Sequence, residues 1–214
     1  KKNKINLIEN LPWLEKHTKV ETIPNPIDLN KIGFLTEDVY PLPEQFGDYI
    51  VSAGRLIDEK GFDILIESFG ILKKDIPELK LVILGEGIKR RFLEEKIHEL
   101  CLENDIYLKG FVTNVFPFFK YAKLAVVSSR VEGFPNVLLQ MMSQNTSVVS
   151  TKCCSGIDEI PGLFVSEINN AEDLYKQIRS AITYDTANNR FIFDQFLENR
   201  SIEKFINKVE GKLK

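Results

Sequence analysis

The feature that most constrains the fold is a regular alternation, from Tyr49 to Ser166, of short apolar β-branched runs with longer amphipathic segments. Strands that are apolar on both faces and alternate with helices form parallel sheets that helices cover on both sides. We therefore predict an α/β fold, a Rossmann-like doubly wound parallel sheet. The predicted strands are 49–53, 81–84, 106–108, 124–128, 147–151 and 163–165, and helical spacing occurs over 62–72, 92–101 and about 135–143.

The two ends of the chain differ from this centre. Thr22–Asp28 contains two prolines, and residues before prolines are extended, so this segment is predicted as a linker. Apolar residues before it indicate a helix that is broken, or begins, near Pro12. Helices are predicted at 171–183 and 201–213, and the second carries one apolar stripe. Packing against a domain is the usual use of such a stripe, and membrane-surface binding is the rarer one.

Composition excludes several classes of function. Of the 214 residues, 43% are hydrophobic and 28% charged, and the net charge of −3 argues against a nucleic-acid partner. No run approaches the ~18 apolar residues of a membrane span, and no signal-peptide pattern opens the chain. Three cysteines make a poor disulfide framework, which favours a cytoplasmic location, and two histidines without clustered ligands argue against zinc.

Glycines and charged residues follow the predicted strands, where ligands bind in open α/β sheets. Gly54-Arg55 follows the first strand and Lys60-Gly61 opens the next helix; Gly85-Glu86-Gly87, Gly110-Phe111-Val112 and Glu132-Gly133 follow later strands. The sequence therefore predicts a binding site along this edge. Gly85 and Gly87 lack the third glycine of a dinucleotide fingerprint, which argues against NAD.

The stretch Val126–Gln140 indicates what this site binds. It contains a strand, a glycine turn with one acid, and a helix that opens with Pro135-Asn136. The start of a helix can hold an anion, and Glu132 can accept hydrogen bonds from hydroxyls. Phosphate beside hydroxyls describes a sugar nucleotide.

Other interpretations of these residues stay open at this point. Arg55 and Lys60 can neutralise a diphosphate without a metal, and the chain has no Asp-x-Asp motif, but both could instead pair with Asp58 and Glu59 on the surface. Phe111 is by default a core residue rather than a base-stacking one. A bulky cluster is assigned to packing: Phe116, Phe118, Phe119 and Tyr121.

Taken in order, these motifs resemble family-4 glycosyltransferases, which are retaining enzymes of the GT-B fold. The resemblance extends from Asn25-Pro26-Ile27-Asp28 to the C-terminal helix and includes the series Glu132–Leu139. It implies that the chain is the C-terminal, donor-binding half of a GT-B fold. The implied divisions are a residual N-terminal-domain segment and linker at 1–28, a Rossmann-like donor-binding domain at 29–200, and a C-terminal helix at 201–214.

The resemblance also assigns roles to residues. It implies that Arg55 and Lys60 hold the donor diphosphate and that Glu132 is the catalytic residue, in contact with the sugar. It further implies a set of donor contacts: Gly54 and Gly85 in the loops, the backbone of Phe134, Pro135 and Asn136 at sugar hydroxyls, the N–H groups of Val137 and Leu138 at the phosphates, Phe111 and Val112 at the nucleobase, and position 140 at the ribose. Such enzymes use no cofactor and usually no metal.

Two departures from the family pattern matter. The second glutamate of the motif, which accepts hydrogen bonds from the ribose diol in the family, is replaced here by Gln140. The loss of one charge-assisted hydrogen bond is expected to weaken donor binding by roughly 1–3 kcal/mol. The N-terminal half, which binds the acceptor, is not in this sequence. The chain alone is therefore expected to bind donor but hardly to transfer sugar.

The implied function is transfer of a sugar from a nucleotide diphosphate sugar to a glycan or lipid-linked acceptor, with a UDP-sugar favoured. The composition and the family's occurrence suggest bacterial surface polysaccharide synthesis, of capsule or lipopolysaccharide, with peripheral association of the full-length protein at the inner face of the cytoplasmic membrane as an option. Two alternatives remain: a non-catalytic nucleotide-sugar binding module, and another GT-B enzyme such as a sugar-nucleotide epimerase or a phosphorylase.

Overall fold

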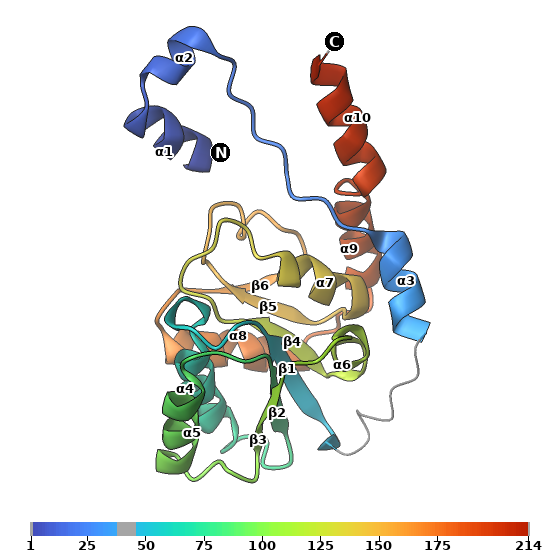
Figure 1. Cartoon of the computed structure of the whole chain (residues 1–214). Helices are drawn as coiled ribbons and strands as arrows, with labels where there is room; N and C mark the ends of the chain where they lie inside the picture. The colour runs from blue at the N-terminus through green and yellow to red at the C-terminus, as the bar shows by residue number, and fades with distance from the viewer. Residues whose placement is uncertain (1, 38–45, 214) are drawn as a thin grey trace.

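A computed structural model describes residues 2–37 and 46–213 and contains one parallel sheet (Figure 1). The strands are β1 (Tyr49–Ala53), β2 (Lys80–Leu84), β3 (Ile106–Gly110), β4 (Leu124–Val127), β5 (Val148–Thr151) and β6 (Phe164–Ser166). All neighbours are parallel, in the order β3-β2-β1-β4-β5-β6. This is the order of a doubly wound sheet, in which the strands are added toward one edge up to β3 and toward the other edge from β4 onward. The strand order therefore reverses between β1 and β4. The predicted fold class is confirmed.

Both faces of the sheet are buried, which explains the continuous apolar runs in the sequence. Along β1, Val51 belongs to one hydrophobic core and Ile50 to the other. Along β4, Ala125 and Val126 divide in the same way. Successive side chains of a strand point to opposite faces, so each strand contributes to both cores.

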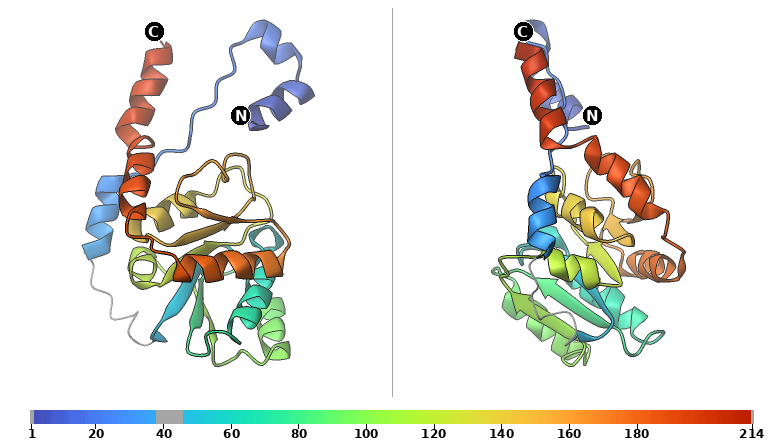
Figure 2. Two further views of the ribbon diagram at one scale, coloured as in Figure 1. Left: turned by 180° about the vertical axis from the view of Figure 1, so that it is seen from behind. Right: turned by 90° about the vertical axis from the view of Figure 1, so that its right-hand side faces the viewer.

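Helices cover the two faces (Figure 2). On one side lie α4 (Phe62–Leu72), α5 (Arg90–Glu99) and α8 (Ala171–Thr183). On the other side lie α3 (Leu29–Glu37), α6 (Phe116–Tyr121), α7 (Asn136–Gln144) and α9 (Asn189–Glu198). The short 3-10 helix η2 (Asp58–Lys60) connects β1 to α4. This layering leaves the loops at the carboxyl ends of β1 and β4 to form the site.

The terminal helices project from the body of the molecule on the same side (Figure 1). α1 (Lys2–Asn10) and α2 (Trp13–His17) are separated next to Pro12, as predicted, and α10 (Ile202–Leu213) ends the described chain. The linker is tied to the start of α10, because the Ile27 N–H donates to the Arg200 carbonyl at 2.8 Å and Ile27 forms a parallel bridge with Ser201. The division into domains stays a prediction.

Several sequence-based expectations differ in detail from the structure. Predicted strand ends agree within two residues, and three helices were not predicted: α3, α6 and α9. The packing of Phe116, Phe118 and Phe119 is confirmed, but that of Tyr121 is wrong, since its side chain is 59% exposed. Tyr121 is the last residue of α6, and the buried residues of that helix are its first four, 116–119.

Candidate functional site

Glu132 lies in the loop between β4 and α7 and is held in a fixed position. Its backbone N–H donates to the Cys153 carbonyl at 3.0 Å. Its Oε1 accepts from Lys60 Nζ at 2.5 Å and from Ser129 Oγ at 2.9 Å. The Glu132 and Lys60 side chains are only 17% and 19% exposed. The carboxylate is therefore oriented by a half-buried ion pair, with its second oxygen left for other donors.

Lys60 comes from the loop after β1, which is brought against the loop after β4 because β1 and β4 are neighbours in the sheet. Ser128 Oγ donates to the Lys60 carbonyl at 2.8 Å. The next residue, Gly61, has φ +60°, and a Cβ there would lie 2.2 Å from the Ser128 carbonyl oxygen. Only glycine allows this approach. The alternative of Lys60 pairing with Asp58 or Glu59 is wrong: Asp58 pairs with Lys89 at 2.8 Å and Lys60 with Glu132.

Arg130 connects the loop after β4 with the loop after β1 and the start of α4. It was not among the site residues predicted from the sequence. Its guanidinium donates to both carboxylate oxygens of Asp63 at 2.8 and 2.6 Å, to the Asp58 carbonyl at 2.6 Å and to Asn169 Oδ1 at 2.7 Å. Burial alone would raise the pKa of Asp63, but the hydrogen bonds and charge of Arg130 outweigh burial and hold the pKa of that carboxyl below its ordinary value. Asp63 is 67 residues away in sequence, so no local pattern marks the pair.

Most of the predicted site residues line two adjoining cavities. The first, which we name the central cavity, has a volume of about 390 Å³. The second, the apolar cavity, has a volume of about 270 Å³ and shares Ala53, Gly54, Arg55 and Val115 with the first. Predicted residues in the central cavity are Gly54, Arg55, Lys60, Glu132, Phe134, Pro135, Asn136, Val137 and Gln140; those in the apolar cavity include Gly85, Phe111 and Val112.

Arg55 differs from Lys60 in being available to a ligand. Its side chain is exposed and makes no hydrogen bond or ion pair with any residue in the described ranges. Lys60 is paired with Glu132, which also lines the central cavity. Among the described residues, the cavity thus presents one unpaired cation, Arg55, and one cation, Lys60, that already has a carboxylate partner.

The start of α7 forms the other wall of the central cavity. Asn136 is held from outside by the linker, because Asn25 Nδ2 donates to Asn136 Oδ1 at 2.7 Å. Val137 lines the cavity, but Leu138 does not: its side chain is fully buried and its N–H donates to the Pro135 carbonyl at 3.0 Å. The predicted role of the Leu138 N–H is therefore not supported, since the first turn of the helix already uses that group.

The apolar cavity depends on a close approach between two loops. Gly85 has φ +131°, and a Cβ there would lie 2.0 Å from the Gly54 carbonyl oxygen. Phe111 is 77% exposed, so its default assignment to the core is wrong. It is instead an accessible aromatic side chain at one end of the pair of cavities.

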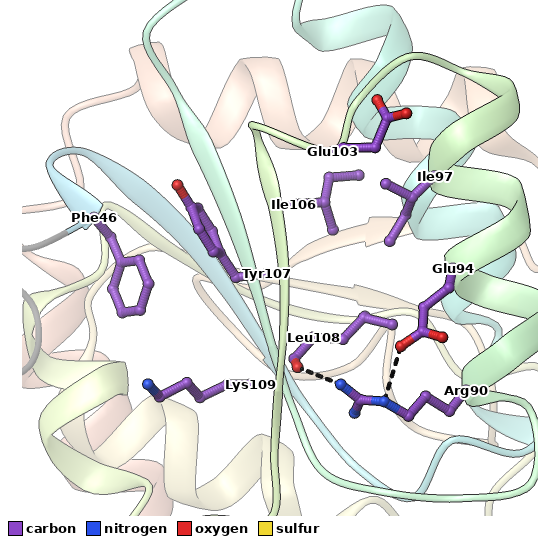
Figure 3. A pocket seen from close by; sticks show the side chains of 9 residues that line it. All are labelled: Phe46, Arg90, Glu94, Ile97, Glu103, Ile106, Tyr107, Leu108 and Lys109. Atoms are coloured by element: carbon purple, nitrogen blue, oxygen red, sulfur yellow. Dashed lines mark hydrogen bonds and ion pairs between the residues drawn. The ribbon is translucent and has the colours of Figure 1, made fainter.

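A larger cavity, of about 510 Å³, lies elsewhere, between the edge strand β3 and α5 (Figure 3). Figure 3 shows Arg90 donating to Glu94 and to the Leu108 carbonyl, at 2.9 and 3.0 Å. Arg90 also pairs with Glu86 at 2.8 Å. Its charge is thus already neutralised, which makes this cavity a weaker candidate than the central cavity.

The described residues contain neither a metal-binding cluster nor a membrane-spanning helix. Across 2–37 and 46–213, no group of three or more His, Cys, Asp or Glu side chains is placed to hold a metal ion. No helix in those ranges is long and apolar enough to cross a membrane. That the site works without a metal stays a prediction.

Comparison with known proteins gives related sequences. A glycosyltransferase of Methanocaldococcus jannaschii that is itself uncharacterized is 35% identical over 172 residues, which are 74% of this chain and 42% of the relative. An N-acetylgalactosaminyltransferase of Campylobacter jejuni, which acts on a diphospho-undecaprenol substrate, is 34% identical over 190 residues, which are 86% of this chain and 50% of the relative. The chain thus spans about half the length of the curated relatives it matches.

Solved structures agree on the fold. The crystal structure of Anabaena HepE in complex with UDP superposes with a TM-score of 0.78 at 21% identity, over 92% of this chain and 57% of HepE. Residues 42–193, well over half of the chain, match the family model described as glycosyl transferases group 1. On that match, the chain belongs to the group 1 glycosyl transferases.

Proposed function

We propose that this chain is the donor-binding part of a retaining, family-4 glycosyltransferase that transfers a sugar from a UDP-sugar to a glycan or lipid-linked acceptor. The observation that carries the proposal is the central cavity, where Arg55, Lys60 and Glu132 meet the start of α7. Two cations and a helix start suit a diphosphate, and a fixed carboxylate suits sugar hydroxyls. The apolar cavity with Phe111 suits a nucleobase, because exposed aromatic rings stack on bases.

Similar proteins support the substrate class. The name of the Campylobacter relative describes transfer onto a glycan carried by diphospho-undecaprenol. Another relative, 30% identical over 155 residues, is a lipopolysaccharide core biosynthesis glycosyltransferase of Rhizobium meliloti. HepE was solved with UDP. These names favour uridine as the base and a bacterial surface polysaccharide as the product. We further propose that the product is made at the inner face of the cytoplasmic membrane.

The proposed chemistry uses this chain's residues as follows. Arg55 and Lys60 stabilise the diphosphate that leaves as the donor's glycosidic C–O bond breaks. Glu132 orients the sugar and stabilises positive charge at its anomeric carbon. An acceptor hydroxyl oxygen forms the new bond on the face that the diphosphate leaves and passes its proton to the departing diphosphate oxygen, so configuration is retained. The reaction is proposed to need no metal and no cofactor.

The test is calorimetric titration of the chain with UDP and with GDP. We expect saturable UDP binding, loss of at least about tenfold in affinity for Arg55→Ala, and no effect for Arg91→Ala, an exposed arginine on α5 paired with Glu95. Absence of binding to both nucleotides at millimolar concentration would contradict the proposal. Binding of GDP in preference to UDP would correct the base only.

Gln140 favours a second candidate, a nucleotide-sugar binding module without activity, because the amide lacks the second acceptor oxygen of a carboxylate. The two candidates differ in the full-length protein. A module is indicated if that protein binds UDP-sugar, transfers nothing, and gains transfer on Gln140→Glu. Transfer by the unaltered protein supports the glycosyltransferase.

A further inference from the structure

Arg200, between α9 and α10, is a cation without a counterion. Its guanidinium packs against two phenylalanine rings, with its Cζ 4.6 Å from the centroids of both Phe134 and Phe196. Its side chain makes no hydrogen bond or ion pair with any residue in the described part of the chain. The rings offer no hydrogen-bond acceptor of ordinary strength, so the N–H groups at the edge of the guanidinium are left for a partner.

Holding an unpaired charge in this position is unfavourable. Burial lowers the pKa of Arg200, and the neighbouring Cys154 offsets this only in part. A half-buried cation without hydrogen-bond acceptors costs free energy unless a partner satisfies it. Proteins keep such arrangements chiefly where a ligand supplies the partner.

Arg200 faces a cavity of about 470 Å³, which we name the Arg200 cavity. Its walls come from the linker (Thr22–Asn25), from Gly133 and Phe134, from the loop after β5, and from α9. Phe134 also lines the central cavity, and Gly133 follows Glu132 directly. A ligand in the Arg200 cavity would therefore lie next to the site at which the donor sugar is proposed to bind.

The linker gives the cavity a defined position. The Arg200 carbonyl accepts the Ile27 N–H at 2.8 Å, and Asn25 donates to Asn136 in the central cavity at 2.7 Å. The junction of α9 and α10 thus lies beside the segment that leads into α3 (Figure 1). The linker therefore contacts both the backbone of Arg200 and Asn136 at the start of α7, and so fixes the two relative to each other.

We propose that Arg200 and this cavity bind a phosphate group of the acceptor, next to the donor sugar. The proposal rests on the proposed function and selects, from its two acceptor classes, the lipid-linked acceptor that carries phosphate. A planar guanidinium fits the oxygens of phosphate in a bidentate way, and a volume of about 470 Å³ leaves room for the sugar that carries the phosphate.

Replacing one carboxylate in the cavity should change ligand affinity in a direction that depends on whether the ligand is charged. Glu159 lines the cavity, is exposed, and makes no ion pair with Arg200. If the ligand is an anion, Glu159 repels it and Glu159→Gln strengthens binding. If the ligand is a neutral sugar, Glu159 accepts hydrogen bonds from its hydroxyls, and Glu159→Gln weakens binding.

The experiment is an NMR titration of the ¹⁵N-labelled chain with inorganic phosphate, at constant ionic strength set by chloride and with UDP saturating the central cavity. We expect the Arg200 Nε–H signal to shift saturably. We expect Arg200→Gln to weaken phosphate binding about tenfold or more and Arg200→Lys, which keeps the charge but loses the planar edge, to weaken it less. Glu159→Gln should strengthen it a few-fold, about the effect of removing one nearby like charge.

Two results would overturn the proposal: phosphate affinity that Arg200→Gln and Arg200→Lys leave unchanged, or affinity that Glu159→Gln reduces. Binding of neutral glucose with the same dependence on Arg200, in the absence of phosphate binding, would also overturn it. Failure of the proposed function is seen separately, as a lack of UDP binding by the unaltered chain. In that case the phosphate titration is made with Arg55→Ala, which lacks the free cation of the central cavity.

Discussion

Lys60 Nζ lies 2.5 Å from Glu132 Oε1, although 72 residues separate them in sequence. The two residues carry different proposed roles, at the diphosphate and at the sugar. In the free protein each is the other's partner. We therefore propose that donor binding involves an exchange, in which Lys60 turns to phosphate and Glu132 is released to the sugar.

This exchange predicts that Glu132→Gln increases the affinity for UDP, which has no sugar. Removing the carboxylate frees Lys60, and a half-buried ion pair of this kind is worth on the order of 1 kcal/mol, about fivefold in affinity. The same variant should lose sugar transfer in the full-length protein. Calorimetry with UDP checks the first part.

The matched control is Glu95→Gln, which removes an exposed carboxylate paired with Arg91 on α5 and should leave UDP affinity unchanged. Weaker UDP binding by Glu132→Gln, with Glu95→Gln neutral, would show that Glu132 supports Lys60 rather than competing for it.

The sheet could be predicted from sequence because each central strand is apolar on both faces. The predicted bounds of β1 and α8 agree with the structure at both ends. α9 was missed because its aromatic residues do not mark one face: Phe193 is fully buried, whereas Phe191 is 67% exposed. Helical periodicity cannot be recognised when large apolar side chains lie on both sides of a helix.

The candidate site could be predicted in position but not in its internal contacts. The rule that ligands bind at the carboxyl ends of strands brings Gly54, Arg55 and Glu132 together. No rule of spacing pairs Lys60 with Glu132 or Asp63 with Arg130, because these contacts depend on which loops become neighbours in three dimensions. Arg200 was missed for the same reason, since its rings come from the α7 loop and from α9.

Gln140 gives a prediction about donor affinity. It lines the central cavity at the position where the family pattern has a carboxylate. We expect Gln140→Glu to raise UDP affinity about tenfold, by restoring one charge-assisted hydrogen bond to the ribose diol. Gln144→Glu, one turn further along α7 and outside the residues lining the cavity, makes the same change of charge and should have little effect. Equal effects of both variants would indicate a general electrostatic change instead.

Gly85 gives a prediction about stability. Alanine there would meet the Gly54 carbonyl oxygen at 2.0 Å and would adopt an unfavourable φ of +131°. We expect Gly85→Ala to lower the free energy of unfolding by roughly 2–4 kcal/mol, measured by urea denaturation. Gly211→Ala, in α10 with open space around it, should instead be neutral or stabilise by up to about 1 kcal/mol. A neutral Gly85→Ala would mean that the β1 and β2 loops can separate without cost.

The Asp63–Arg130 pair gives a prediction about pH. The pKa of Asp63 is lower in the folded protein than its unfolded value of about 3.9, so the pair stabilises the fold above that pH and loses its contribution as the pH falls through the folded value. We expect Asp63→Asn to lower the free energy of unfolding by about 1–3 kcal/mol at pH 7. As the pH falls below the folded pKa of Asp63, the two proteins should converge.

Asp48→Asn is the control, because Asp48 pairs with Lys123 where both side chains are about half exposed or more, and such pairs contribute about 0–1 kcal/mol. Urea denaturation at several pH values between 7 and 2 measures all three proteins. A constant difference between Asp63→Asn and the unaltered chain across this range would contradict the prediction, because it would assign the effect to the shape of the side chain. A difference that disappears as Asp63 protonates assigns it to the charge that joins the two loops of the site.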